Sequence, residues 1–292
     1  MRQIFIDVLY KEAKENKNFV LMVGDLGFSV VEKFQKKYPM RFFNAGVAEQ
    51  NMTGMASGLA SEGCQVFTYS IANFNTFRCA EQIRNDIDYH NLPVTIVTVG
   101  GGLAYGSLGY SHHAIQDYGL MRLFPNMSIL SPGDPIEVNS LVKYAIKNNG
   151  PCYLRLNKTG EPAIHKSNIQ ITDANFFEIK KNPETKKLIL TTGSTLLTGL
   201  KFLNKSKYKK FSLSSCPIWG QKFKKKIAKE IYKWKEIIVL EDHLIDCGFF
   251  SYIKEITHNT DKKIIIKSIA LKNDIIGKSG SQEYLNELGG LK

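Results

Sequence analysis

The sequence predicts an α/β protein of two domains, each built on a mainly parallel sheet. Apolar, β-branched runs alternate with helical patterns over the first 157 residues, and the alternation restarts after a mixed stretch at 159–186. The strand-like runs are apolar at successive positions, as in parallel strands that are covered on both faces. We therefore expect one domain at 1–160, a linker at 161–186 and a second domain at 187–292.

The first domain is expected to alternate strands and helices in order. The expected strands are Phe19–Val23, Gln65–Ser70, Val94–Val99, Met127–Leu130 and Cys152–Leu156. The expected helices are Ile4–Asn16, Val30–Lys37, Glu49–Ser61, Thr76–Tyr89 and Pro135–Lys147. A short apolar strand also precedes Glu49. Asp134 is the expected N-cap of the last helix, with Pro135 at its first position.

The mixed stretch contains two short β-like pieces, Asn168–Thr172 and Phe176–Lys180. After it, the expected strands are Lys187–Thr192, Phe211–Ser214, Glu236–Glu241 and Lys263–Ile269. The expected helices are 193–203, Gln221–Trp234, Ile245–Ile256 and Gln282–Leu288. This order of elements again indicates a mainly parallel sheet.

Composition excludes several classes of protein. No apolar run approaches the roughly 20 residues that a membrane-spanning helix needs, and the N-terminal residues lack the pattern of a signal peptide. The five cysteines are far apart and form no Cys-x-x-Cys pair, which argues against a disulfide framework and against a zinc site. We expect a cytoplasmic protein with buried, reduced thiols and no metal site of its own.

The net charge of +12 lies entirely in the second half. Residues 1–150 carry 13 basic and 13 acidic side chains, whereas residues 151–292 carry 26 and 14. The second-half basic residues are nearly all lysines, without arginine clusters or interleaved aromatics. This pattern favours a solvated face, or one facing an acidic partner subunit, over a nucleic-acid site.

Glu49 is the first candidate for chemistry. It lies where a short strand ends and a helix rich in glycine and alanine begins, the edge at which open α/β sheets bind ligands. An acid in the first turn also complements the helix dipole, so a purely structural role is open. The small residues of this helix would let a ligand or another helix approach closely.

Two further segments end strands of the same expected sheet. The aromatic segment 67–77, with Tyr69, Phe74 and Phe77, offers flat apolar surfaces for a heteroaromatic ring, although each ring could equally be core. The loop that starts at the three glycines 100–102 carries the adjacent His112 and His113 and leads to Asp117. These groups suit proton transfer or hydrogen bonds to an oxygenated substrate, and adjacent histidines suit a metal poorly.

These three segments, in this order, resemble the pyrimidine-binding domain of transketolases, and 187–292 resembles the transketolase C-terminal domain, including Val239-Leu-Glu-Asp-His243 and Gly277-Lys-Ser-Gly280. The likeness covers nearly the whole chain and is greatest to the separate C-terminal subunits of split transketolases. It implies a thiamine-diphosphate-binding fold of the pyrimidine type, followed by a transketolase C-terminal-like domain.

The resemblance also implies residue roles. Glu49 matches the acid that hydrogen-bonds the aminopyrimidine ring and activates the cofactor, while the cofactor supplies the difficult chemistry. Phe74 matches the aromatic residue that packs on the pyrimidine, with Phe77 and Tyr69 as alternatives, and Asp25 matches an acid near the cofactor. His112 matches a residue that contacts the substrate, and His113 lies beside it. Arg2, Ser29 and Lys158 match residues that contact a sugar phosphate. Most relatives carry arginine at Lys158, which can bind phosphate with two hydrogen bonds.

The sequence departs from the family at two substrate-binding positions. A histidine expected near Gly100 is missing, and Leu108 stands where the family has an acid, with Tyr110 in place of a proline. The diphosphate- and Mg²⁺-binding motif, Gly-Asp-Gly, is also missing; Gly24-Asp25-Leu26 is not that motif. The oxygen ligands of Mg²⁺ are therefore expected from a partner chain.

The resemblance implies the C-terminal subunit of a split transketolase, transferring a two-carbon ketol unit between ketose and aldose sugars or their phosphates, in an unusual-sugar or polysaccharide pathway. The partner would be the N-terminal, diphosphate-binding subunit, sharing thiamine diphosphate in an α2β2 heterotetramer. Neither nucleic acid nor membrane is expected as a partner. Two alternatives are the β subunit of a 2-oxo acid dehydrogenase E1 and a non-catalytic regulatory subunit that retains the fold.

Overall fold

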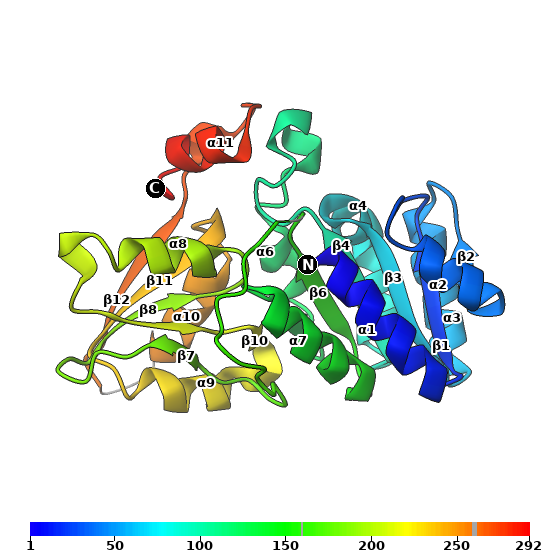
Figure 1. Cartoon of the computed structure of the whole chain (residues 1–292), viewed down its shortest axis with the longest axis horizontal. Helices are drawn as coiled ribbons and strands as arrows, with labels where there is room; N and C mark the ends of the chain where they lie inside the picture. Colours follow the sequence, from blue (N-terminus) through cyan, green and yellow to red (C-terminus); the bar gives the residue numbers. More distant parts are fainter. Residues whose placement is uncertain (159, 259–261) are drawn as a thin grey trace.

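A computed structural model describes residues 1–158, 160–258 and 262–292. Within them the chain forms two mainly parallel sheets that lie side by side, the first at the right of Figure 1 and the second at the left. The expected fold class is therefore confirmed. Position 159, where the expected mixed stretch starts, lies outside the described residues.

The first sheet has the strand order β10-β5-β6-β4-β3-β1-β2. Its strands are β1 (Phe19–Val23), β2 (Phe42–Asn44), β3 (Gln65–Ile71), β4 (Val94–Val99), β5 (Ser128–Leu130), β6 (Cys152–Leu156) and the antiparallel β10 (Ile218–Trp219). The accompanying helices are α1 (Arg2–Glu15), α2 (Glu32–Lys37), α3 (Glu49–Ser61), α4 (Ala72–Thr76), α5 (Ala80–Gln82), α6 (Asp117–Met121) and α7 (Pro135–Lys147). Asp134 caps α7 as expected, since its Oδ1 accepts a hydrogen bond from Glu137 N at 2.8 Å.

The second sheet has the order β12-β11-β8-β9-β7. Its strands are β7 (Phe177–Lys180), which is antiparallel to β9, and β8 (Lys187–Thr191), β9 (Ser212–Ser215), β11 (Glu236–Leu244) and β12 (Ile265–Leu271). Its helices are α8 (Thr195–Phe202), α9 (Lys224–Ile231), α10 (Phe249–His258) and α11 (Gln282–Leu288). Among the described residues, no helix is long and apolar enough to cross a membrane.

The burial of the first sheet explains why its strands appear in the sequence as unbroken apolar runs. Every residue of β1, β4 and β6 is buried, because helices cover both faces of the first sheet. The apolar runs that predicted these strands coincide with them residue for residue. Long-range burial of apolar side chains, rather than local propensity, therefore fixes this sheet.

Two expectations about elements were wrong, and one strand had not been expected. The expected helix Thr76–Tyr89 is broken into α5, a 3₁₀ turn at Phe77–Cys79 and a π-helical turn at Ile83–Asp88. The Thr76 hydroxyl donates to Ala72 O at 2.7 Å, a local bond that bends helices. Residues 168–172 form no strand. β10 was not expected, and it places residues from the second half in the first sheet; the domain limits stay a prediction.

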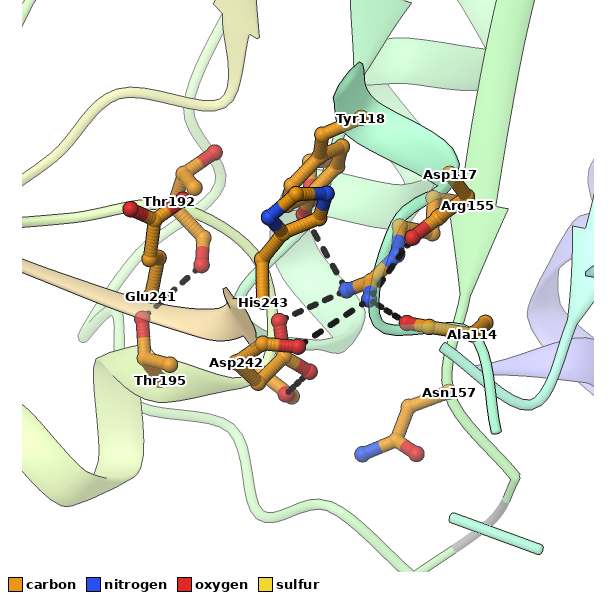
Figure 2. Close-up of polar contacts among 12 residues, drawn as sticks. Ala114, Asp117, Tyr118, Arg155, Asn157, Thr192, Thr195, Glu241, Asp242 and His243 are labelled. Atoms are coloured by element: carbon orange, nitrogen blue, oxygen red, sulfur yellow. Dashed lines mark hydrogen bonds and ion pairs between the residues drawn. The ribbon is translucent and has the colours of Figure 1, made fainter. Parts of the chain in front are cut away.

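A buried ion-pair network joins the two sheets (Figure 2). Arg155, in β6, donates from Nε to Asp117 Oδ2 at 2.6 Å and from Nη1 to Asp242 Oδ1 at 2.7 Å. Its Nη2 donates to Ala114 O at 2.7 Å, and its guanidinium lies 4.2 Å from the ring centre of Tyr118. Asp117 is fully buried here and also accepts from Tyr153, so its expected contact with substrate is wrong.

Candidate active site

Glu49 lies at the start of α3, against the carboxyl ends of β1 and β3. Its side chain is 1% exposed. Ser70, in β3, donates to Glu49 Oε1 at 3.4 Å, and a Cβ at Gly24, just after β1, would lie 3.5 Å from Glu49 Cγ. A side chain at position 24 would therefore make ordinary contact with the acid. The carboxylate sits at the sheet edge where the strand order predicts ligand binding.

Arg78 is the partner of Glu49, and sequence reasoning missed it. Its Nη1 donates to Glu49 Oε2 at 2.7 Å, and its guanidinium lies 4.8 Å from the ring centre of Phe74. Arg78 sits in the 3₁₀ turn that follows α4, where the expected helix is broken, and from there it contacts both Glu49 and Phe74. The sequence signal that could have identified Arg78 is a cation directly after the aromatic segment 67–77. Glu49, Arg78 and Phe74 therefore form one contiguous cluster.

The histidine loop is fastened to the same cluster. Asn73, in α4, donates from Nδ2 to Ser111 O at 3.1 Å and to His113 O at 3.0 Å. The ring of His112 meets that of Phe74 edge-on, with centres 5.1 Å apart. Burial lowers the pKa of His112, and the adjacent His113 lowers it further, which favours the neutral imidazole. Such a ring can donate to or accept from a substrate hydroxyl.

The second domain braces this loop. Gly280 N donates to Gly106 O at 3.2 Å, and a Cβ at Gly106 would collide with Gly280 O and Leu285. In Figure 1 the loop rises beside α11, at the top of the molecule. The position of His112 therefore depends on packing between the two halves of the chain.

Two expected site residues lie differently from the prediction. His113 is 1% exposed, and its Nε2 lies 3.1 Å from Gly106 O, so it supports the loop from within rather than facing a substrate. Tyr69 is 1% exposed and stacks on Phe5 with ring centres 6.1 Å apart. Phe77 is 45% exposed, and among the three candidate aromatics only Phe74 contacts both Arg78 and His112.

Two of the three residues expected to contact phosphate, Arg2 and Lys158, lie beside this cluster. Arg2 Nε donates to Lys158 O at 2.9 Å, and Lys158 Nζ lies 5.5 Å from the ring centre of Tyr105. Tyr105 in turn faces His112, with ring centres 6.3 Å apart. Burial raises the pKa of Tyr69 to about 12, against the opposing effect of Arg2 nearby. Two cations therefore border the edge of the histidine cluster.

Asp25 and Ser29 lie in the loop that follows β1. Both have positive φ, 54° and 63°, a conformation that costs non-glycine residues about 1 kcal/mol or more. Asp25 accepts from Asn44 Nδ2 at 3.0 Å, while its own amide donates to Asn44 Oδ1 at 3.1 Å. Strain held in place by side-chain bonds is typical of ligand-binding loops.

The cluster has the chemistry to hold and activate a heteroaromatic cofactor. A buried carboxylate, an aromatic ring and an imidazole converge on one sheet edge, with cations nearby for an anionic group. Among the described residues no group of three or more His, Cys, Asp or Glu side chains could hold a metal ion.

Comparisons with known proteins agree with this chemistry. Residues 1–161 match the family described as transketolase, pyrimidine binding domain. A putative transketolase C-terminal section of Methanocaldococcus jannaschii is 33% identical over 100% of this chain and 92% of its own length. One of the subunits of an apulose-4-phosphate transketolase of Actinobacillus succinogenes is 27% identical over 100% of this chain and 94% of its own length.

A solved structure shares the complete architecture. The protein described as "Split gene transketolase, inactive beta4 tetramer" superposes with a TM-score of 0.87 at 28% identity, covering 100% of this chain and 93% of that one. Both sheets and their connections therefore have a counterpart in a single solved chain.

Proposed function

This chain belongs to the transketolase family, and we propose that it is the C-terminal subunit of a split, thiamine-diphosphate-dependent transketolase. The proposed reaction transfers a two-carbon ketol unit between ketose and aldose sugars or their phosphates. The convergence of Glu49, Phe74 and His112 on one sheet edge carries the proposal. Relatives of similar length are separate transketolase sections or subunits, which supports the split form.

In this proposal each residue of the cluster has one task. Glu49 hydrogen-bonds a ring nitrogen of the aminopyrimidine, for which its burial and its place at the sheet edge suit it. Phe74 packs against the ring, and Arg78 must leave its face for the ring to do so. Thiamine diphosphate, when bound, supplies the carbanion chemistry. His112 holds a hydroxyl of the sugar.

Arg2, Lys158 and Ser29 are proposed to bind the phosphate of a sugar phosphate. Arg2 and Lys158 are linked by a hydrogen bond, and Lys158 lies next to Tyr105, whose ring faces that of His112. A sugar reaching from His112 to these cations would place its phosphate at the rim of the cluster. Leu108, 54% exposed, offers no hydrogen bond where the family has an acid, which leaves the sugar itself open.

A partner subunit is proposed to cover the open edge beside β2 and α3. Large apolar side chains are exposed there, namely Phe28, Phe43, Val47, Met55 and Phe77. A Cβ at Gly54 or Gly58 of α3 would meet nothing within 4 Å, so this helix presents a slim, open face. Exposed apolar surface next to an incomplete site is typical of an interface. The partner would supply the diphosphate site and Mg²⁺, in an α2β2 assembly.

The experiment is an activity assay of this chain with its N-terminal partner, thiamine diphosphate and Mg²⁺. Glu49→Ala is expected to lower ketol transfer by about 100-fold or more, the usual effect of losing an acid–base group. Glu62→Ala is the matched control, since Glu62 is exposed at the opposite end of α3. Turnover that survives Glu49→Ala would refute the mechanism.

The same assay separates the alternatives. Decarboxylation of pyruvate without ketol transfer would indicate the β subunit of a 2-oxo acid dehydrogenase E1. Partner activity that is unchanged when this chain is omitted would indicate a non-catalytic regulatory subunit.

A further inference from the structure

A cavity that the proposed reaction does not use lies where the second domain meets the rest of the chain. It has a volume of about 720 Å³ and is lined by α8, the end of β11 and α11, together with Gly133, Asn157 and residues 160–162. That volume lies within the range of roughly 300–1,000 Å³ that is usual for small-molecule sites. None of Glu49, Phe74 or His112 contributes to its wall.

The topology of the second sheet puts this cavity where α/β folds bind ligands. From β8 the chain passes through α8 to β9 on one side, and later returns to β11 on the other side of β8. The strand order therefore reverses between β8 and β11. Ligands of open α/β sheets bind outside the carboxyl ends of strands at such a reversal. Ser194, following β8, and Asp242, in β11, both line the cavity.

The chemistry of the wall favours an anion. Ser194, Thr198, Lys201 and Lys205 lie three or four residues apart, so they form one stripe along α8 and its end. Ser194 lies at the positive end of the helix dipole, whereas Lys201 and Lys205 lie at the other end of α8 and just beyond it. Among the described residues neither Lys201 nor Lys205 has a carboxylate partner; Lys205 Nζ lies over the ring of Phe202, 4.4 Å from its centre.

Each acid of the wall already has a cationic partner. Asp242 is bound by Arg155 at 2.7 Å and by the Ser194 hydroxyl at 2.6 Å, as Figure 2 shows for Arg155. Glu161 pairs with the N-terminal ammonium at 3.3 Å, and Glu283 pairs with Lys292 at 3.4 Å. Arg155 and Lys292 each serve two carboxylates, so the positive charge that is free for a ligand is local to Lys201 and Lys205.

One polar atom of the wall has no partner. Asn286 Oδ1 is buried and accepts no hydrogen bond from any described residue. Asn286 lines the cavity from α11. A buried acceptor without a donor costs free energy that a ligand hydroxyl or amine would recover. The wall thus offers two cations from α8 and the residues after it, and an amide from α11.

We propose that this cavity binds a phosphorylated metabolite of about nucleotide size, with its phosphate at Lys201 and Lys205 and its donor groups toward Asn286. The cavity adjoins the sugar-phosphate contacts proposed for Arg2 and Lys158, since Asn157 lines it, but neither Arg2 nor Lys158 does.

The test is calorimetric titration of the full-length chain with AMP, with inorganic phosphate and adenosine as partial probes. AMP is expected to bind, phosphate to compete with it, and adenosine to bind at least about tenfold more weakly, because the phosphate meets both lysines. Lys201→Glu/Lys205→Glu is expected to weaken AMP binding by at least about tenfold, whereas Lys201→Arg/Lys205→Arg keeps it.

Lys209→Glu/Lys210→Glu is the matched control, since it makes the same change in net charge at exposed positions outside the cavity. Circular dichroism confirms that each variant is folded. The proposal is overturned if AMP does not bind, if adenosine binds as tightly as AMP, or if both double reversals weaken binding equally. Loss of AMP binding in Lys158→Glu alone would place the nucleotide in the active site and would also overturn it.

Discussion

Replacing Arg155 with methionine is expected to destabilise the fold by an amount that reports the buried network between the sheets. The Arg155 side chain is 2% exposed, and those of Asp117 and Asp242 are 0% and 6% exposed. Methionine keeps the apolar length of arginine but removes the cation. Both carboxylates would then remain in the protein interior without their charged partner.

The structure sets the magnitude. Removing one partner of a buried ion pair costs about 3–5 kcal/mol, because the other charge is left uncompensated. Lys224→Met is the control: it breaks the Lys224–Glu255 pair at 2.9 Å, in which the side chains are 41% and 46% exposed. Exposed pairs contribute about 0–1 kcal/mol. The two variants should therefore differ by several kcal/mol, although each loses one cation.

The assay is urea unfolding followed by tryptophan fluorescence. Trp219 suits it because its ring centre lies 5.1 Å from that of Tyr118, which Arg155 covers. Adding Asp117→Asn and Asp242→Asn to Arg155→Met should restore part of the loss, since the buried charges disappear. A loss below about 1 kcal/mol for Arg155→Met, or a triple variant less stable than the single one, would refute the reasoning.

Three other expectations follow from the same structure. Burial raises the pKa of Glu241 to about 8, against the lowering by the amides of Phe250 and Phe249. The stabilising effect of Glu241 is therefore complete below pH 4.5 and is lost as pH rises through about 8. In urea unfolding at several pH values, the free energy of unfolding of Glu241→Gln should depend less on pH than that of the unaltered protein, and an equal dependence would contradict this. Arg78→Ala should lower the free energy of unfolding by about 1–2 kcal/mol, because Glu49 then keeps only the long contact with Ser70. The double variant Glu49→Gln/Arg78→Ala should recover part of this loss, and additive losses in the double-mutant cycle would argue against the ion pair. Gly58→Trp should leave the melting temperature of the isolated chain nearly unchanged but prevent co-purification with the partner, whereas Gly58→Ala should not; a normal complex with Gly58→Trp would place the interface elsewhere.

The sequence predicted the first sheet well because its strands are buried on both faces. Phe19–Val23, Val94–Val99 and Cys152–Leu156 carry their signal locally, in unbroken apolar runs. β10 could not be found in this way. It is two residues long, and its pairing with β5 joins positions far apart in the chain.

The sequence picked out Glu49 and His112 as candidate site residues because an acid and a histidine carry chemistry by residue type alone; the structure brings both to one cluster, and their roles stay a prediction. Arg78 and Asp117 were missed or misassigned because their roles depend on partners 29 and 38 residues away. Arg155 carried a sequence signal for the role of Asp117, since a charge inside an apolar strand requires a buried counter-charge. Which acid supplies it depends on the three-dimensional packing, which no local pattern contains.

The central claim is that Glu49 activates thiamine diphosphate held between this chain and its partner. The most direct measurement is the rate at which the C2 proton of bound thiamine diphosphate exchanges with deuterium, followed by NMR in the assembled complex without sugar. We expect Glu49→Ala to slow this exchange by about 100-fold or more while the cofactor still binds. Exchange in the Glu49→Ala complex as fast as in the unaltered complex would contradict the account.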